Sequence, residues 1–232
     1  MKNNITMKYN RRTSTFLWRS VLTLLLAFGI SATSWAQNSP TGNLEYVHGL
    51  HGSIHVKGWC EDPDNIDSRL TVAVYVKDNN NQPVEGYDPV YLTADQLRNG
   101  EDNQLHYNGY EVYLPIATAG TYKVDVMHID ATIDESIIYF TSGIQVSAPY
   151  TVTYNANGGT GAPAQQLKGE NVDLELSSVY PTWSSYDFIC WNTAANGSGT
   201  NYNASSTYRG NADLTLYAMF TASYIPGSGT QS

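Results

Sequence analysis

The sequence of 232 residues has only two cysteines and no long hydrophobic run. Cys60 and Cys190 fall in different predicted domains, and a disulfide needs Cα atoms within about 7 Å of each other. We therefore expect two buried thiols that act as small apolar side chains. The longest apolar run, residues 21–30, covers about ten positions, well short of the roughly 20 that a membrane-spanning helix needs. Insertion into a membrane is therefore not predicted.

The first 36 residues have the composition of a secretory signal peptide. Five basic side chains precede the apolar run, and the pattern Ser34-Trp35-Ala36 that follows it is a small-x-small cleavage site. No cysteine follows this site, so a lipoprotein anchor is not expected. We expect a mature chain that begins at Gln37 and is exported across the inner membrane to the periplasm, the cell surface or the extracellular medium.

Basic side chains are scarce once the signal peptide has been removed. Five of the 12 Lys and Arg leave with it, so seven remain against 21 Asp and Glu, and the formal charge of the mature chain is −14. Such a surface repels phosphate backbones and anionic lipid head groups. Nucleic acid and membrane lipids are therefore disfavoured as partners.

A change of pattern near Pro149 divides the mature chain into two predicted domains. In residues 42–148, short β-rich runs alternate with turn signals, and the run Leu70–Val76 places four apolar side chains on one face. This spacing predicts a β-sandwich. One exception is the segment 93–97, where Thr93 and Gln96 form a capping-box signature that predicts a short helix.

Residues 150–221 read as one small β module, followed by a flexible tail at 222–232. Its order is a strand at 150–154, the turn Asn155-Ala-Asn-Gly-Gly-Thr-Gly-Ala-Pro163, the motif Tyr186-x-Phe188-x-x-Trp191-Asn-Thr193, the turn Gly197-Ser-Gly-Thr200 and the strand Asp213-Leu-Thr-Leu-Tyr-Ala218. This order resembles the internalin-type B-repeat, also called the Listeria-Bacteroides repeat. The resemblance implies a compact β-grasp-like fold that serves bacterial secreted and surface proteins as a non-catalytic spacer or interaction unit. Ser185 and Cys190 depart from the family pattern, which commonly has glycine at both positions.

The first predicted domain carries a second resemblance. The segment Gly58-Trp-Cys-Glu-Asp-Pro-Asp64, followed by a Val/Tyr strand and later by Asn108-Gly-Tyr110 and Gly120-Thr-Tyr-Lys-Val124, is similar to an immunoglobulin-like module of bacterial extracellular proteins. Cys60 stands where that module typically has alanine. The resemblance implies an immunoglobulin-like sandwich, so the whole chain is predicted to be mainly β, a sandwich followed by a β-grasp-like repeat.

Two polar clusters contain side chains of the types that bind metal ions. His48, His51 and His55 lie close in sequence, but glycines interrupt the segment and no glutamate completes the metalloprotease pattern. Three carboxylates at positions 62, 64 and 67 offer oxygen ligands, but the twelve-residue calcium loop with its glycine and terminal glutamate is missing. We therefore expect no metal and no cofactor.

No local pattern of catalytic residues is recognisable. The glycine turn at 158–161 lacks the Gly-Lys-Ser/Thr ending of a phosphate-binding loop. Neither cysteine has a basic neighbour in sequence that would lower the pKa of its thiol, and no serine stands in a nucleophile motif. The sequence therefore predicts a protein that is not an enzyme.

Aromatic side chains provide the remaining functional signal. Trp191 and Tyr154 lie in predicted strands, where they are expected to build a core. Trp183 and Tyr180 flank Pro181 in a predicted loop and are the candidate partner contacts, with Tyr87 and Tyr91 as weaker candidates. The hypothesis is a secreted bacterial surface or extracellular protein that acts in protein binding, adhesion or spacing. The alternative is a carbohydrate-binding accessory module.

Overall fold

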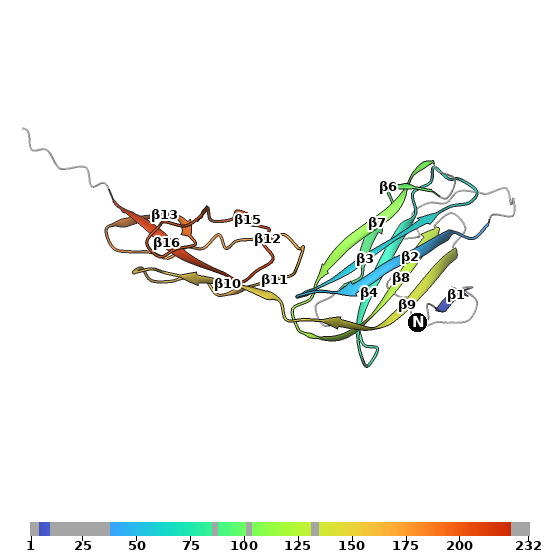
Figure 1. The fold of residues 1–232 in the computed structure, drawn as a ribbon, viewed down its shortest axis with the longest axis horizontal. Helices are drawn as coiled ribbons and strands as arrows, with labels where there is room; N and C mark the ends of the chain where they lie inside the picture. The colour runs from blue at the N-terminus through green and yellow to red at the C-terminus, as the bar shows by residue number, and fades with distance from the viewer. Residues whose placement is uncertain (1–4, 10–37, 85–87, 101–103, 131–134, 224–232) are drawn as a thin grey trace, which may run out of the picture. The chain divides into compact units, whose positions relative to one another are not determined.

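The computed structural model describes residues 5–9, 38–84, 88–100, 104–130 and 135–223, and every regular element in these ranges is a β-strand (Figure 1). The predicted fold class, mainly β with a sandwich-like arrangement, is confirmed. Within these ranges no helix has the length and apolar character that crossing a membrane would require. The apolar run of the predicted signal peptide lies outside the described residues.

Contacts between Cα atoms divide the chain into two compact units. The first unit contains residues up to Gly49 together with 54–112 and 120–146, and the second contains 147–232 with the short segments 50–53 and 113–119. The main division therefore falls three residues before Pro149, close to the predicted boundary. That each domain folds by itself stays a prediction.

The first unit is built from two antiparallel sheets, which Figure 1 shows as two layers. One sheet has the order β1-β9-β8-β4-β5, and the other has the order β2-β3-β7-β6. The strands are β1 (Ile5–Tyr9), β2 (Thr41–Gly49), β3 (Ser53–Glu61), β4 (Thr71–Asp78), β5 (Val90–Thr93), β6 (Gln96–Asn99), β7 (Leu105–Pro115), β8 (Gly120–Asp130) and β9 (Glu135–Val146).

Aliphatic side chains from the two sheets form the core of the first unit. Leu70 and the three valines of β4 at positions 72, 74 and 76 are buried, as their alternation predicts. Ile54 and Val56 of β3 are also fully buried, whereas the neighbouring Lys57, whose side chain alternates to the other face of the strand, is exposed. Ala73, which alternation places on the opposite face of β4 from these valines, is buried as well.

The predicted short helix at 93–97 is wrong. Thr93 ends β5 and Gln96 begins β6, so the chain leaves one sheet at this point and enters the other. The buried Ala94 links the two strands, and its N–H donates to the carbonyl of Leu70 at 3.0 Å. Tertiary hydrogen bonding has overridden a capping signature whose side chains would have stabilised only one turn.

Strand β1 lies within the predicted signal peptide, where no strand is expected from the sequence. Its backbone pairs antiparallel with the edge of β9, with Ile5 opposite Phe140 and Tyr9 opposite Ser136. In the sheet order β1 is an edge strand. Removal of residues 1–36 would therefore leave β9 at that edge.

The second unit contains a five-stranded mixed sheet of order β11-β10-β16-β13-β14 and a small two-stranded sheet, β12 with β15. The first and last long strands, β10 and β16, run parallel at the centre, with Val152 opposite Leu214. The strands are β10 (Tyr150–Asn155), β11 (Gln166–Lys168), β12 (Leu174–Glu175), β13 (Tyr186–Asn192), β14 (Asn201–Tyr202), β15 (Thr207–Tyr208) and β16 (Leu214–Ala222).

Large aromatic rings dominate the core of the second unit. Trp191 is fully buried and packs on Tyr154, with ring centroids 4.9 Å apart. Both predicted core aromatics are thereby confirmed. The other buried members of this core are Val152, Leu176, Tyr208, Leu216 and Ala218.

Candidate functional site

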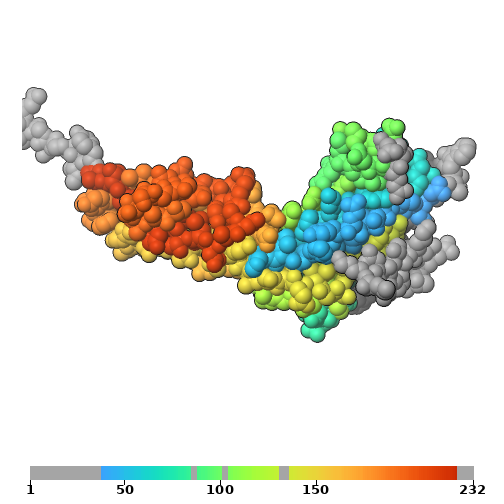
Figure 2. All heavy atoms as spheres, viewed as in Figure 1, coloured from blue at the N-terminus to red at the C-terminus, as the bar shows by residue number. Residues whose placement is uncertain are grey.

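Five aromatic rings of the second unit form one connected group, which we name the aromatic cluster. Its members are Tyr180, Trp183, Tyr186, Phe188 and Phe220. The first two lie in the connection between β12 and β13, the next two lie in β13, and the last lies in β16. In space-filling form the orange and red residues of these late strands cover much of the visible face of the second unit (Figure 2).

Successive ring contacts join the members of the aromatic cluster. Tyr180 stacks on Phe188 with centroids 4.5 Å apart and an interplanar angle of 9°. Phe188 meets Phe220 edge to face at 6.1 Å, and Phe220 meets Trp183 edge to face at 5.3 Å. Trp183 lies 4.8 Å from Tyr186. The two residues predicted from the sequence, Tyr180 and Trp183, therefore belong to one surface although their rings are joined only through others.

Much of this aromatic surface is open to solvent. The relative exposure is 49% for Tyr180, 41% for Trp183 and 43% for Tyr186, and the neighbouring Val179 and Ile189 are also exposed. Phe188 is half-buried and touches the core through Trp191, with centroids 5.2 Å apart. The cluster is thus anchored on the core and presents its outer rings to solvent, which is characteristic of interaction sites.

The loop that carries Trp183 is fixed to the first glycine turn. Thr182 and Thr160 exchange two backbone hydrogen bonds of 2.8 and 2.9 Å. Gly158, with a φ of 101°, lies beneath the indole, and a Cβ at that position would come within 2.8 Å of the Trp183 ring. Glycine is required there both for the left-handed backbone and for the close approach. The candidate contact residue is therefore held in place before any partner binds.

The two departures from the repeat pattern have structural outcomes. Ser185 adopts a φ of 64°, so serine takes the left-handed conformation that glycine adopts without cost. The turn is preserved, with the N–H of Tyr186 donating to the carbonyl of Trp183 at 3.1 Å. Cys190 is buried next to Trp191, directly after an irregularity in the β13–β16 pairing.

Sequence alternation does not predict Tyr186 and Phe188 as site residues, because their exposure depends on an irregularity in β13. Their position in an alternating run predicted a strand, which is correct. However, the register shift between Phe188 and Cys190 leaves the first half of β13 open and buries three successive residues, 190–192. A bulge changes the direction in which the side chains of a strand point, and hydrophobic alternation in the sequence does not predict where a bulge lies.

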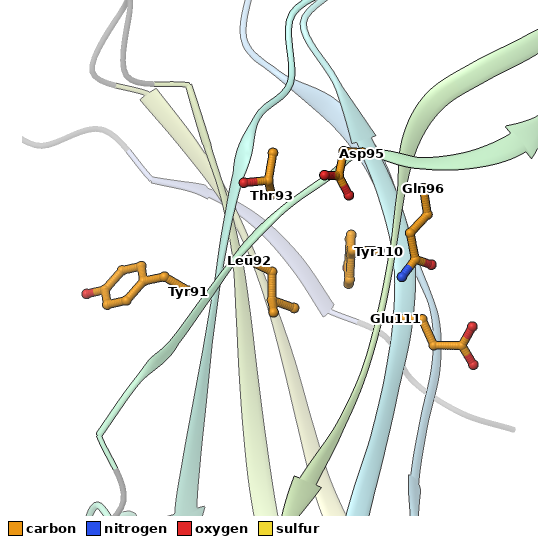
Figure 3. A pocket seen from close by; sticks show the side chains of 7 residues that line it. All are labelled: Tyr91, Leu92, Thr93, Asp95, Gln96, Tyr110 and Glu111. Carbon is orange, nitrogen blue, oxygen red and sulfur yellow. The ribbon is translucent and has the colours of Figure 1, made fainter. Parts of the chain in front are cut away.

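The first unit has a separate hollow of about 330 Å³ where the chain passes from β5 to β6 (Figure 3). Figure 3 shows Leu92, Asp95, Gln96 and Tyr110 gathered around it, whereas the ring of Tyr91 points away. Thr93 and Glu111 complete its lining. Tyr91, one of the weaker candidates, thus lies at a pocket, while Tyr87 falls outside the described residues.

Several polar groups of this pocket are already engaged in the fold. Glu111 Oε1 lies 2.7 Å from His55 Nε2, and the Tyr110 hydroxyl lies 2.8 Å from His128 Nε2. Burial raises the pKa of Tyr110 and lowers the pKa of His128 to about 3. The pair is therefore neutral at physiological pH and acts as a structural hydrogen bond within the core.

Side chains of the histidine cluster and of the aspartate cluster make contacts within the fold. The ring of His48 lies 3.9 Å from that of Tyr46, and His51, which belongs to the second unit, stacks on Tyr150 at 5.0 Å. Asp62 is buried, and its Oδ1 accepts the N–H groups of Asp64 and Asn65 at 2.9 and 3.3 Å. Within the described ranges no group of three or more His, Cys, Asp or Glu side chains is arranged to hold a metal ion.

Both cysteines are free and buried, as predicted. Burial raises the pKa of the Cys60 thiol to about 12, with a further contribution from the charge of Glu61. Burial likewise raises the pKa of Cys190. A thiol of raised pKa is a poor nucleophile at neutral pH, so the chemistry of both residues is that of apolar packing.

Comparison with known families matched residues 150–219 to the Listeria-Bacteroides repeat domain. This stretch contains β10 to β16 up to Met219 and most of the aromatic cluster. The resemblance seen in the sequence is confirmed for this part of the chain. The comparison with curated proteins and the comparison with solved structures each found no match. The repeat indicates a bacterial surface or extracellular repeat protein.

Proposed function

We propose that this chain is a secreted, non-catalytic protein that binds an extracellular protein partner through the aromatic cluster. The observation that carries the proposal is the connected set of rings from Tyr180 to Tyr186, half open to solvent and fixed on the core by Phe188. Large rigid aromatic side chains supply much of the binding energy in protein interfaces. The immunoglobulin-like first domain would act as the spacer that presents the repeat.

Pre-organisation supports this assignment. Trp183 packs against Phe220 and over Gly158, and its loop is tied by Thr160. A side chain that is already ordered loses little conformational freedom on binding, so more of its contact energy appears as affinity. The net charge of −14 in the mature chain favours a basic partner and predicts an association rate that falls with salt.

A carbohydrate-binding function is the second candidate. Exposed aromatic faces can stack on sugar rings, and Tyr180 and Tyr186 add hydroxyl groups at the same surface. The polar pocket around Asp95 and Gln96 in the first unit supplies a second observation in its favour.

A pull-down from cell-envelope extract and a glycan array, both performed with the mature chain, separate the two candidates. Retention of one defined protein that fails to bind the Trp183→Ala variant supports protein binding. Tyr107→Ala is the matched control, because Tyr107 is an exposed aromatic residue of the first unit outside the cluster. Binding to a soluble oligosaccharide alone would favour the second candidate, and binding to neither would favour a spacer.

A further inference from the structure

A lysine side chain is buried in the second unit. Lys168 ends the edge strand β11, and its relative exposure is 1%. Lysine is almost never fully buried unless it is paired with an opposite charge. Among the described residues no carboxylate lies within ion-pair distance of its Nζ, which instead donates to the carbonyl of Gly169 at 2.6 Å and to Asn211 Oδ1 at 3.4 Å.

The Asn211 carboxamide, which accepts from the Lys168 amine, is also hydrogen-bonded to Asn171. Asn211 Oδ1 accepts the backbone N–H of Asn171 at 2.9 Å, and Asn211 Nδ2 donates to Asn171 Oδ1 at 2.8 Å. Asn171 adopts a φ of 58°, so the turn that places these two groups is left-handed. The carbonyl oxygen of Asn211 therefore lies between the lysine amine and a backbone N–H donor.

This arrangement contains the parts of an acyl-transfer site. Burial lowers the pKa of Lys168, against the opposing effect of the charges of Asp173 and Glu170, and so increases the fraction of neutral, nucleophilic amine. A backbone N–H directed at a carbonyl oxygen stabilises the negative charge that develops there during attack. The Asn171 N–H has this position relative to Asn211.

We propose that Lys168 and Asn211 form an intramolecular isopeptide bond. Lys168 Nζ attacks Cγ of Asn211, the new Nζ–Cγ bond forms, and the Cγ–Nδ2 bond breaks. A protonated lysine and a carboxamide give a secondary amide and one ammonium ion, so atoms and charge balance without another reactant. The two protons that Lys168 Nζ loses leave with the Asn211 amide nitrogen as part of the ammonium ion.

The bond would join an edge strand to the connection between β15 and β16. It would close a covalent loop from residue 168 to residue 211 that contains β12 to β15. A cross-link of this kind restricts the unfolded chain. An extracellular module with a small core would gain resistance to unfolding without a disulfide, for which its single cysteine offers no partner. This inference is independent of the proposed binding function.

The test is the intact mass of the purified, folded mature chain after incubation at neutral pH, followed by peptide mapping. We expect a mass lower by one ammonia molecule and a branched peptide that joins Lys168 to Asn211, with no tryptic cleavage after Lys168. The Lys168→Met and Asn211→Ala variants should lack this loss, while Lys57→Met, an exposed lysine of β3, should retain it.

Two other reactions release ammonia and must be separated. Cyclisation of an amino-terminal Gln37 and succinimide formation at the Asn157-Gly158 step both give the same mass change. Peptide mapping assigns the loss to one position. A loss that persists in Lys168→Met and maps to either position, or a folded parent chain of full mass, would overturn the proposal, and the parent measurement decides even if a variant fails to fold.

Discussion

The cores of the two units contain aromatic side chains in different proportions. The first unit, the sandwich, buries three tyrosines among a much larger number of aliphatic residues. The core of the second unit, which contains the matched repeat, has few residues besides Trp191, Tyr154 and Tyr208. Most strands of the second unit are short and supply few core residues, so each of these residues must fill a large volume. The repeat thus concentrates its stability in a few positions, and the sandwich distributes it over many.

Both units use buried polar side chains to hold turns. In the second unit, Asn192 makes hydrogen bonds to Ala194, Gly197 and Gly199. In the first unit, the buried Asp62 accepts two backbone N–H groups of its turn. The first unit also buries His128 on β8, where its Nε2 lies 2.8 Å from the Tyr110 hydroxyl. Turns need side chains that satisfy their backbone groups, whereas paired strands satisfy their own.

The largest expected effect is that of Trp191→Ala. Emptying a fully buried aromatic site in a small core should destabilise the second unit by about 3–5 kcal/mol. A change in the sandwich that removes a single methyl group, Ile54→Val, should cost only about 0.5–1.5 kcal/mol. Urea unfolding followed by hydrogen exchange would assign each loss to its unit. An unchanged midpoint for Trp191→Ala would show that the indole contributes nothing to the core.

Each of the two domains is expected to fold without the other. Residues 42–148 and 150–221, each expressed alone, should give a cooperative thermal transition because each contains its own core. Circular dichroism during heating measures this. If neither fragment unfolds cooperatively, the two-domain interpretation is wrong.

Protonation of histidine at low pH should destabilise the sandwich but not residues 150–221, because residues 150–221 contain no histidine. Burial lowers the pKa of His128 in the folded state to about 3, whereas the unfolded value is near 6.5. The unfolded state therefore binds the proton more readily, and stability is lost as pH falls below about 6.5. At two pH units below that value the loss is about 2–3 kcal/mol.

The pH effect is measured by urea unfolding of the mature chain between pH 7 and pH 4.5. His128→Gln should flatten the pH dependence of the sandwich transition and leave that of the repeat unchanged. A parent protein and variant with the same pH slope would contradict a neutral, buried His128.

A smaller effect is expected for Asn192→Ala. The side chain is fully buried, and its Oδ1 accepts the N–H groups of Ala194 and Gly199 at 2.8 and 3.0 Å. Removing it leaves these groups unsatisfied, at a cost of about 1–3 kcal/mol. Denaturant unfolding would measure the loss. Asn196→Ala is the control, since its hydrogen bonds to Ser198 are exposed, and an equal loss in both variants would refute the buried role.

The smallest expected effect is that of a chelator. The melting temperature of the mature chain should not change, because neither the histidines near His51 nor the aspartates near Asp62 form a complete ligand set. A decrease in melting temperature that added calcium reverses would show that the Asp62 turn binds metal.

The sequence predicted most of the strands and the aromatic core, because alternation reports directly which face is buried. Leu70 to Val76, Trp191 and Tyr154 are examples. The helix predicted at Thr93–Leu97 is wrong, because pairing with strands distant in sequence outweighs the local capping pattern there. The sequence also did not place Tyr186 and Phe188 at the surface, since the bulge before Cys190 depends on the partner strand β16.

The candidate site was recognised only in part for the same reason. Trp183 and Tyr180 were identified because a loop beside Pro181 has no alternation that would bury them. Their connection through Phe188 and Phe220 requires two strands that are far apart in sequence. The amine–carboxamide pair of Lys168 and Asn211 likewise joins positions that no local motif links.

We propose that the two tryptophans of the second unit have different roles, Trp191 in folding and Trp183 in binding. The most direct measurement compares the affinity and the melting temperature of Trp183→Ala and the parent chain, with the partner obtained by pull-down, at two salt concentrations. We expect at least a tenfold loss of affinity for Trp183→Ala, with cooperative unfolding retained, since a central aromatic contact contributes more than about 1.4 kcal/mol. Equal affinity of the two proteins at both salt concentrations would contradict a binding role for Trp183.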